Sequence, residues 1–142
     1  MNHFSLTIAS EPDNIGKVEN FIEYIVEEFQ IPDKFYARIA LPVIEATTNS
    51  ILFGNKKDPQ KTVKLYATKG SRKIVITVED EGEGIDFSKL PNFSDTNEFL
   101  ERTGRGLYLM VNLPDKLMFT HNGTKVIMTY FLDKVIGKNS GN

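Results

Sequence analysis

Hydrophobic and polar positions change their period along the chain, and each change marks a predicted element. Alternation of period two predicts a strand, whereas apolar positions three and four residues apart predict a helix. Phe4, Leu6 and Ile8 alternate with polar neighbours, which predicts a half-buried strand near the N-terminus. A helix is then expected from a cap at Ser10 to about Phe29, because a serine just before an apolar-periodic run is a typical N-cap.

A second helix is predicted over residues 33–53, after the break at Ile31-Pro32-Asp33. Pro42 lies inside this segment, and an interior proline removes a backbone hydrogen bond at a cost of about 3 kcal/mol. A kink is therefore expected just before Glu45. The positions expected to face the core are Phe35, Ile39, Ala40, Ile44, Thr48, Ile51 and Leu52.

The following segments predict a hairpin, a loop and a short helix. Alternating apolar positions over residues 63–67 and 74–78, joined by a turn at Lys69-Gly-Ser71, predict two antiparallel strands. Residues 85–102 hold a proline, several Asp, Asn and Ser residues and few apolar ones, so an irregular and mobile loop is expected there. A short helix is expected from Gly106 to about Asn112.

The last structured segment predicts a second hairpin. Asn122-Gly123 lies between residues 116–121 and 124–132 and is the strongest short signal for a two-residue type I′ turn. The resulting order of strand, helix, helix, hairpin, loop, helix and hairpin favours an α+β fold, with helices on one face of a largely antiparallel sheet. Residues 1–136 are expected to form one domain, and 137–142 a disordered tail.

The amino-acid composition excludes several classes of site and partner. The chain has no cysteine, which excludes disulfides, thiolate metal sites and a cysteine nucleophile. Its 17 basic and 19 acidic residues give a formal net charge of −2 without a basic block, so direct nucleic-acid binding is not expected. No stretch approaches the roughly 20 apolar residues of a membrane span. Nor does a basic region with an apolar run mark export, so a cytoplasmic protein is expected.

Two fragments carry candidate chemistry. Glu45-Ala-Thr-Thr-Asn49 places a carboxylate and an amide on one helix face, because residues four apart are neighbours on a helix. Glu45 is then a candidate general base, and Asn49 offers an oxygen of the kind that Mg²⁺ prefers. Asp80-Glu-Gly82-Glu-Gly84 directly follows a predicted strand, where glycines allow the backbone to approach a ligand closely.

A third fragment, Gly104-Arg-Gly106-Leu107, opens the predicted short helix. Backbone N–H groups at a helix N-terminus favour an anion such as phosphate, and Arg102 and Arg105 add positive charge beside them. Taken singly, each of the three fragments also fits a solvated helix face or an ordinary turn. Their order and spacing are therefore more informative than any one of them.

Together the motifs resemble the ATP-binding domain shared by gyrase, the Hsp90 chaperones, histidine kinases and MutL. The most similar group is the small bacterial anti-sigma factor serine kinases, which carry Glu-Ala-x-Thr-Asn where this chain has Glu45-Ala-Thr-Thr-Asn49. The resemblance extends from about Phe4 to Leu132. It implies a Bergerat-type fold, which is a two-layer α/β sandwich with a mixed sheet, and it implies ATP and Mg²⁺ as ligands.

The resemblance also implies a role for each motif residue. Glu45 would be the catalytic base, Asn49 would contact Mg²⁺, and Asp80 would accept a hydrogen bond from the exocyclic amine of adenine. Further nucleotide contacts would come from Gly82, Gly84, Arg102, Gly104, Arg105, Gly106, Leu107 and, at a family position in the last hairpin, Thr124.

The implied activity is transfer of the ATP γ-phosphate to a serine of an anti-anti-sigma factor, by a protein that also binds a sigma factor. The family further suggests a homodimer. Phe53 departs from the pattern, because the family motif commonly has a histidine at this place. A non-catalytic nucleotide-binding module and a simple ATPase therefore remain alternatives to the serine/threonine kinase.

Overall fold

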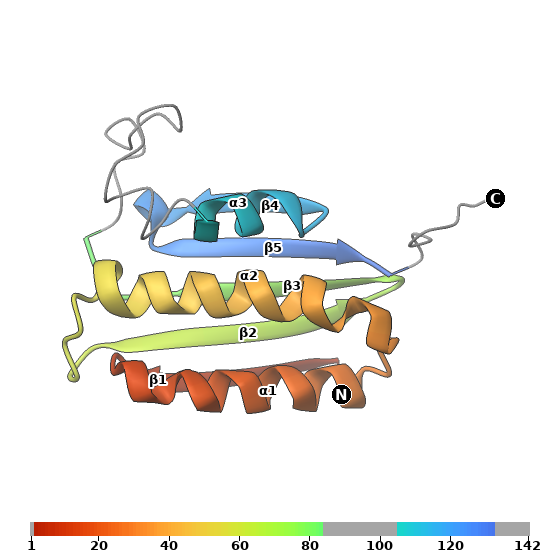
Figure 1. Cartoon of the computed structure of the whole chain (residues 1–142), viewed down its shortest axis with the longest axis horizontal. Coiled ribbons are helices and arrows are strands. Elements are labelled where there is room, and N and C mark those ends of the chain that lie inside the picture. Colours follow the sequence, from red (N-terminus) through yellow and green to blue (C-terminus); the bar gives the residue numbers. More distant parts are fainter. Residues whose placement is uncertain (1, 84–104, 133–142) are drawn as a thin grey trace.

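The computed structural model describes residues 2–83 and 105–132 (Figure 1). The predicted order of strands and helices is confirmed, while the predicted loop over 85–102 and the tail over 137–142 lie outside the described residues. The elements are, in chain order, β1 (His3–Ala9), α1 (Ile15–Glu28), α2 (Tyr36–Asn49), β2 (Thr62–Gly70), β3 (Lys73–Glu79), α3 (Arg105–Asn112), β4 (Lys116–Thr120) and β5 (Lys125–Phe131).

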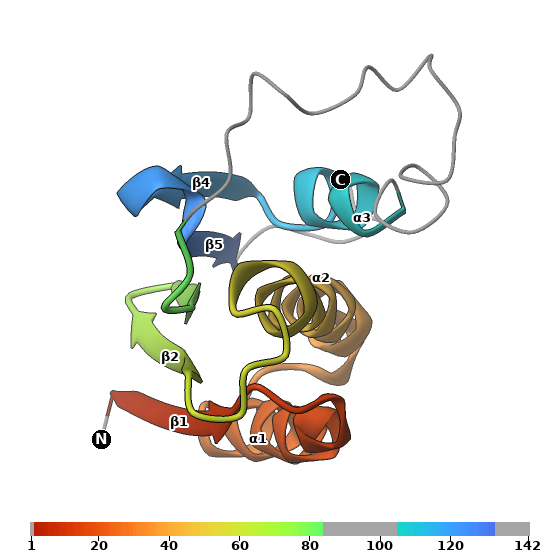
Figure 2. The same ribbon diagram turned by 90° about the vertical axis from the view of Figure 1, so that its left-hand side faces the viewer.

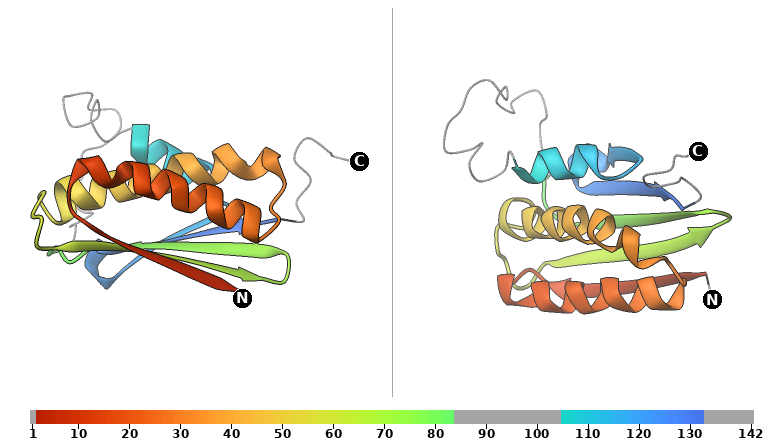
Figure 3. Two further views of the ribbon diagram at one scale, coloured as in Figure 1. Left: turned by 90° about the horizontal axis from the view of Figure 1, so that it is seen from below. Right: turned by 45° about the vertical axis from the view of Figure 1, so that its right-hand side comes forward.

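The described strands form one sheet in the order β1-β2-β3-β5-β4. Figures 2 and 3 show α1, α2 and α3 on the same face of this sheet, which confirms the α+β class and its two layers. Each of the four pairings is antiparallel. The mixed sheet that the resemblance implied is therefore replaced, among the described strands, by a purely antiparallel one.

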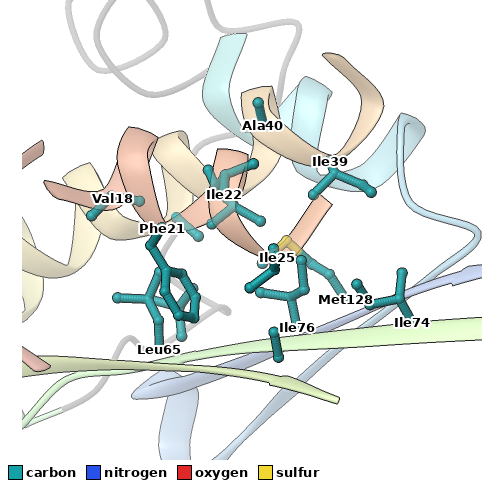
Figure 4. Close-up of a cluster of buried hydrophobic side chains, with 14 of the residues drawn as sticks. Val18, Phe21, Ile22, Ile25, Ile39, Ala40, Leu65, Ile74, Ile76 and Met128 are labelled. Atoms are coloured by element: carbon teal, nitrogen blue, oxygen red, sulfur yellow. The ribbon is translucent and has the colours of Figure 1, made fainter. Parts of the chain in front are cut away.

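The core lies between the helices and the sheet. Figure 4 shows side chains of α1 and α2 facing Leu65, Ile76 and Met128 of the sheet. Full burial of an apolar side chain of this size contributes about 1.5–3 kcal/mol. Spacings of three and four residues place all buried positions of α1 on one stripe, and these positions are Val18, Phe21, Ile22, Ile25 and Val26.

Ser10 has a different role from the predicted helix cap. Its side chain is fully buried, and its hydroxyl donates to the carbonyl oxygen of Lys61 at 2.8 Å. The helix begins later, at Ile15, after a 3-10 turn over Pro12–Asn14. The capping prediction is wrong because burial at the end of β1 gives this hydroxyl a partner that is distant in sequence.

The second predicted helix is present as α2 with a short turn at each end. A 3-10 turn covers Asp33–Phe35, and a turn of π-helix, η3, covers Ser50–Gly54. The helix stays unbroken through Pro42, which is buried. Of the predicted core positions, Ile44 and Leu52 are half-buried and pack against the core. The prediction for Thr48 is wrong, because this residue is half-buried beside a cavity and Thr47 is buried instead.

Both hairpins form, but their turns differ from the predicted ones. Gly70 pairs with Lys73, so the first turn consists of Ser71 and Arg72, and Lys69 and Gly70 belong to β2 instead of the turn. In the second hairpin Thr120 pairs with Lys125, which leaves a four-residue connection over 121–124. Positive φ occurs at Asn122 and Gly123, as expected, but also at His121, so the two-residue type I′ prediction is wrong.

Among the described helices, none is long and apolar enough to cross a bilayer. The single domain over residues 1–136 stays a prediction. What the fold supplies to function is the end of α2, together with the loops that surround it.

Candidate functional site

A cavity of about 480 Å³ lies beside the C-terminal part of α2. Successive lining residues from the helix are separated by three, one, three and one positions, which places them on one helix face. Glu45 and Asn49 are both half-buried and share this cavity, as their spacing predicted. The residues that line it are Glu45, Thr48, Asn49, Leu52, Phe53 and Lys57.

Four further lining residues were not predicted as site residues: Thr48 and Leu52, which were expected in the core, and Phe53 and Lys57. Phe53 is 45% exposed, so its ring forms part of the cavity wall instead of packing in the core. Its position four residues after Asn49 is the sequence signal that could have placed it there. Lys57 follows the helix in a loop, and no periodicity marks it.

The Asp80 carboxylate lies at the end of β3, directly against the end of the helix. A Cβ added to Gly54 would lie 2.5 Å from Asp80 Oδ2, and one added to Gly82 would collide with the carbonyl of Gly54. These glycines are therefore required because two protein segments, the end of η3 and the chain after β3, meet here. The motif predicted instead that its glycines make room for a ligand.

Asp80 is also held by hydrogen bonds. Its Oδ1 accepts from the N–H of Gly82 at 2.8 Å, and its own N–H donates to the carbonyl oxygen of Thr124 at 2.9 Å. Burial raises the pKa of the Asp80 carboxyl, while hydrogen bonds from Gly82 and from the Ser50 side chain lower that pKa in part. The carboxyl is thus fixed in place, at some cost to its charged form.

Asn55 ties this end of the molecule together. It is 1% exposed, and its Nδ2 donates to Ser10 Oγ at 2.6 Å and to the carbonyl oxygen of Thr62 at 2.9 Å. Its Oδ1 accepts from the N–H of Glu81 at 2.8 Å. One side chain therefore joins the end of β1, the start of β2 and the chain that follows β3. No sequence pattern singled out Asn55.

Glu81 adds a fourth contact at the same place. Its Oε2 accepts from the backbone N–H of Thr62 at 2.6 Å and from the Thr62 hydroxyl at 2.7 Å. These bonds hold the pKa of the Glu81 carboxyl below its usual range. The segment that carries Asp80 is thus held by Thr124 through the Asp80 N–H, and by Asn55 and Thr62 through Glu81.

The start of α3 coincides with the third motif. The helix begins at Arg105, one residue before the predicted start at Gly106, and Gly106 and Leu107 follow in its first turn. The helix packs against α2, and Figures 1 and 2 show its N-terminal end and the C-terminal end of α2 facing the same side of the molecule. Three other predicted contacts, Gly84, Arg102 and Gly104, lie outside the described residues.

Thr124 lies next to Asp80 through its backbone. Its hydroxyl donates to the carbonyl oxygen of His121 at 2.8 Å, within its own hairpin. Among the described residues, no group of three or more His, Asp or Glu side chains is arranged to hold a metal ion.

Comparison with known families decides what kind of domain this is. A model of the histidine kinase-like ATPase domain matches residues 8–130. This chain belongs to the histidine kinase-like ATPase family. The match includes Glu45, Asn49 and Asp80, and a domain of this family implies an ATP site. The resemblance inferred from the motifs is confirmed.

Relatives within the family are similar over nearly the whole chain. An anti-sigma F factor of Oceanobacillus iheyensis is 30% identical over 139 residues, which cover 94% of this chain and 94% of the relative. One of Clostridium perfringens strain SM101 is 30% identical over 133 residues, covering 89% and 94%. One of Geobacillus sp. strain WCH70 is 32% identical over 138 residues, covering 93% and 92%.

Proposed function

We propose that this protein is a regulatory serine/threonine kinase of the anti-sigma type, which transfers the γ-phosphate of ATP to a serine of an anti-anti-sigma factor. The observation that carries the proposal is the pair Glu45 and Asn49, which share one cavity in an ATPase domain. The names of the relatives supply the regulatory context. A sigma factor is the second proposed partner, and it would place the activity in the cytoplasm.

Asn49 is the proposed magnesium ligand. Mg²⁺ prefers octahedral oxygen coordination and commonly takes only one or two ligands from protein, with the rest from water and phosphate oxygens. A half-buried amide at the cavity wall fits this requirement. The described residues need therefore supply no further ligand.

Asp80 is the proposed adenine contact. A carboxylate fixed by the Gly82 N–H and packed against Gly54 can accept a hydrogen bond from the exocyclic amine of adenine. Guanine has a carbonyl oxygen at that ring position, which would face the carboxylate acceptor to acceptor. Selectivity for ATP over GTP is therefore proposed.

The phosphates are proposed to lie at the start of α3. Backbone N–H groups at a helix N-terminus attract anions, and the helix begins at Arg105. Thr124 stays a candidate phosphate contact, which requires its hydroxyl to leave the carbonyl of His121. The other proposed nucleotide contacts in these motifs are Gly82, Gly84, Arg102, Gly104, Arg105, Gly106 and Leu107.

Glu45 is proposed to accept the proton of the attacking serine hydroxyl. As the serine oxygen forms a bond to the γ-phosphorus, the bond from that phosphorus to the β–γ bridging oxygen breaks, and ADP leaves. Bound Mg²⁺ would neutralise the charge that develops on the phosphate oxygens. The side chain of Glu45 has no hydrogen bond or ion pair within the described part of the chain, so its oxygens are available for the proton.

The proposal is tested by phosphate transfer. Purified protein, Mg-ATP and an anti-anti-sigma factor from the same cell should give a phosphoserine that is lost when that serine is replaced by alanine. Binding of Mg-ATP without transfer would favour a non-catalytic module, for which the exposed ring of Phe53 in the cavity is the specific support. Turnover of ATP without any acceptor would favour a simple ATPase. A homodimer, the remaining proposal, is tested by the mass of the protein in solution.

A further inference from the structure

The loop after η3 holds two consecutive lysines in an unusual backbone conformation. Lys56 has φ 54° and Lys57 has φ 59°. Side chains with a Cβ rarely adopt the left-handed region, and such residues persist only where the surrounding structure enforces them. Residues in such conformations are often found at ligand sites. The two lysines are therefore candidates for ligand contacts.

Backbone hydrogen bonds enforce the conformation. The N–H of Lys57 donates to the carbonyl oxygen of Ile51 at 2.7 Å, and the N–H of Asp58 donates to that of Asn55 at 3.0 Å. The backbone of Lys57 is thus hydrogen-bonded to η3, the π-helical turn that carries Phe53. The side chain of Lys57 lines the same cavity as Glu45 and Asn49.

The described residues of the cavity wall include one charge of each sign. Of the described residues that line it, Lys57 is the one with a positive charge, and Glu45 is the one with a negative charge. No ion pair joins the two, and the ammonium group of Lys57 has no hydrogen-bond acceptor within residues 2–83 and 105–132. A cation with no partner among the described residues, at the wall of a cavity, fits an anionic ligand.

We propose that Lys57 binds a phosphate group of the nucleotide in this cavity. The inference rests on the proposed function, because it takes the cavity as the ATP site. Neutral Asn49 does not offset the charge of the phosphates, and the ammonium group of Lys57 supplies a positive charge on the cavity wall, in addition to that of Arg105 at the start of α3.

The chain offers a matched control for the test. Lys56 and Lys57 share a left-handed backbone and a positive charge, and both side chains are exposed, but Lys56 does not line the cavity. Lys56→Gln and Lys57→Gln therefore change the net charge and the loop equally. Only the second removes a cation from the cavity.

The experiment is calorimetric titration of wild type and both variants with Mg-ATP, Mg-ADP, AMP and adenosine. Lys57→Gln should weaken Mg-ATP binding about tenfold or more, with unchanged affinity for adenosine. Lys56→Gln should match wild type for all four, and Lys57→Arg should restore part of the loss. Thermal unfolding of the variants checks that each is folded.

The outcomes separate this inference from the proposed function. Equal Mg-ATP affinity for wild type and Lys57→Gln would overturn the role of Lys57 and leave the ATP site standing. An equal loss for adenosine and Mg-ATP would also overturn it, because the lysine would then support the site without contacting phosphate. Absence of Mg-ATP binding to wild type would overturn both proposals.

Discussion

The two ends of the candidate site are organised in opposite ways. At the Asp80 end, the side chains of Asn55, Asp80 and Glu81 all make hydrogen bonds to the protein itself. At the cavity end, the side chains of Glu45 and Lys57 have no such partner in the described part of the chain. The proposed adenine contact at the Asp80 end is therefore preformed. The groups at the cavity end are left to find their partners in the bound nucleotide and the acceptor protein.

The largest effect is expected at the cavity end, from Glu45→Gln. General-base catalysis typically contributes about 10²–10⁴-fold, so transfer to the acceptor serine should fall by that factor while Mg-ATP affinity stays unchanged. Single-turnover transfer and calorimetry together measure this separation. The matched control is Glu19→Gln on the exposed face of α1. Undiminished transfer by Glu45→Gln would remove this residue from the reaction.

A loss of binding is expected from Asn49→Ala. Because the amide is the proposed protein ligand of the metal, Mg-ATP affinity should fall about 100-fold or more. Affinity for ATP in the presence of a chelator should change far less. Titrations with and without Mg²⁺ measure the two numbers. Equal Mg-ATP affinity for variant and wild type would show that the metal assignment is wrong.

At the Asp80 end, Asn55→Ala should lower the free energy of unfolding. The substitution leaves the Glu81 N–H and the Thr62 carbonyl without their buried partner, at a cost of about 1–3 kcal/mol for each group. Urea unfolding measures the free energy of unfolding. Asn14→Ala, which removes a single part-buried bond to the Ala9 carbonyl, is the control and should cost less. A smaller loss for Asn55→Ala than for the control would contradict the anchoring role.

The smallest effect on stability is expected from Asp80→Asn, which should raise the free energy of unfolding instead of lowering it. Burial raises the pKa of the carboxyl above its ordinary value of 3.8, so the ionised form is penalised in the folded state. Wild type should lose stability relative to the variant as pH rises from about 3.8 through the raised pKa, with a constant difference above it. ATP affinity should fall about tenfold through loss of the acceptor charge. Unfolding curves across this pH range would contradict the account if the difference grew towards low pH.

The sequence predicted the cavity end better than the Asp80 end, and the reason is the range of the interactions. Glu45 and Asn49 share a face through helix periodicity, which is a local property that four residues reveal. The bonds of Asn55 reach Ser10 and Glu81, 45 and 26 positions away. No short pattern encodes such pairings, and the Ser10 cap was wrong for the same reason.

Local signals failed where backbone conformation departs from the usual residue preferences. Positive φ at His121 extends the last hairpin beyond the turn that Asn122-Gly123 predicts. Positive φ at Lys57 brings a loop lysine to the cavity wall, although lysine carries no turn signal. Close packing likewise hides the role of Gly54, whose neighbour in space is Asp80.

The most direct test of the account is a crystal structure of the protein with Mg²⁺ and a non-hydrolysable ATP analogue. The account predicts adenine with its exocyclic amine on Asp80, and the triphosphate between the start of α3 and the cavity wall that holds Glu45 and Lys57. It also predicts Asn49 coordinated to Mg²⁺ at about 2.0–2.1 Å. A nucleotide bound elsewhere, or a metal ion that Asn49 does not contact, would contradict it.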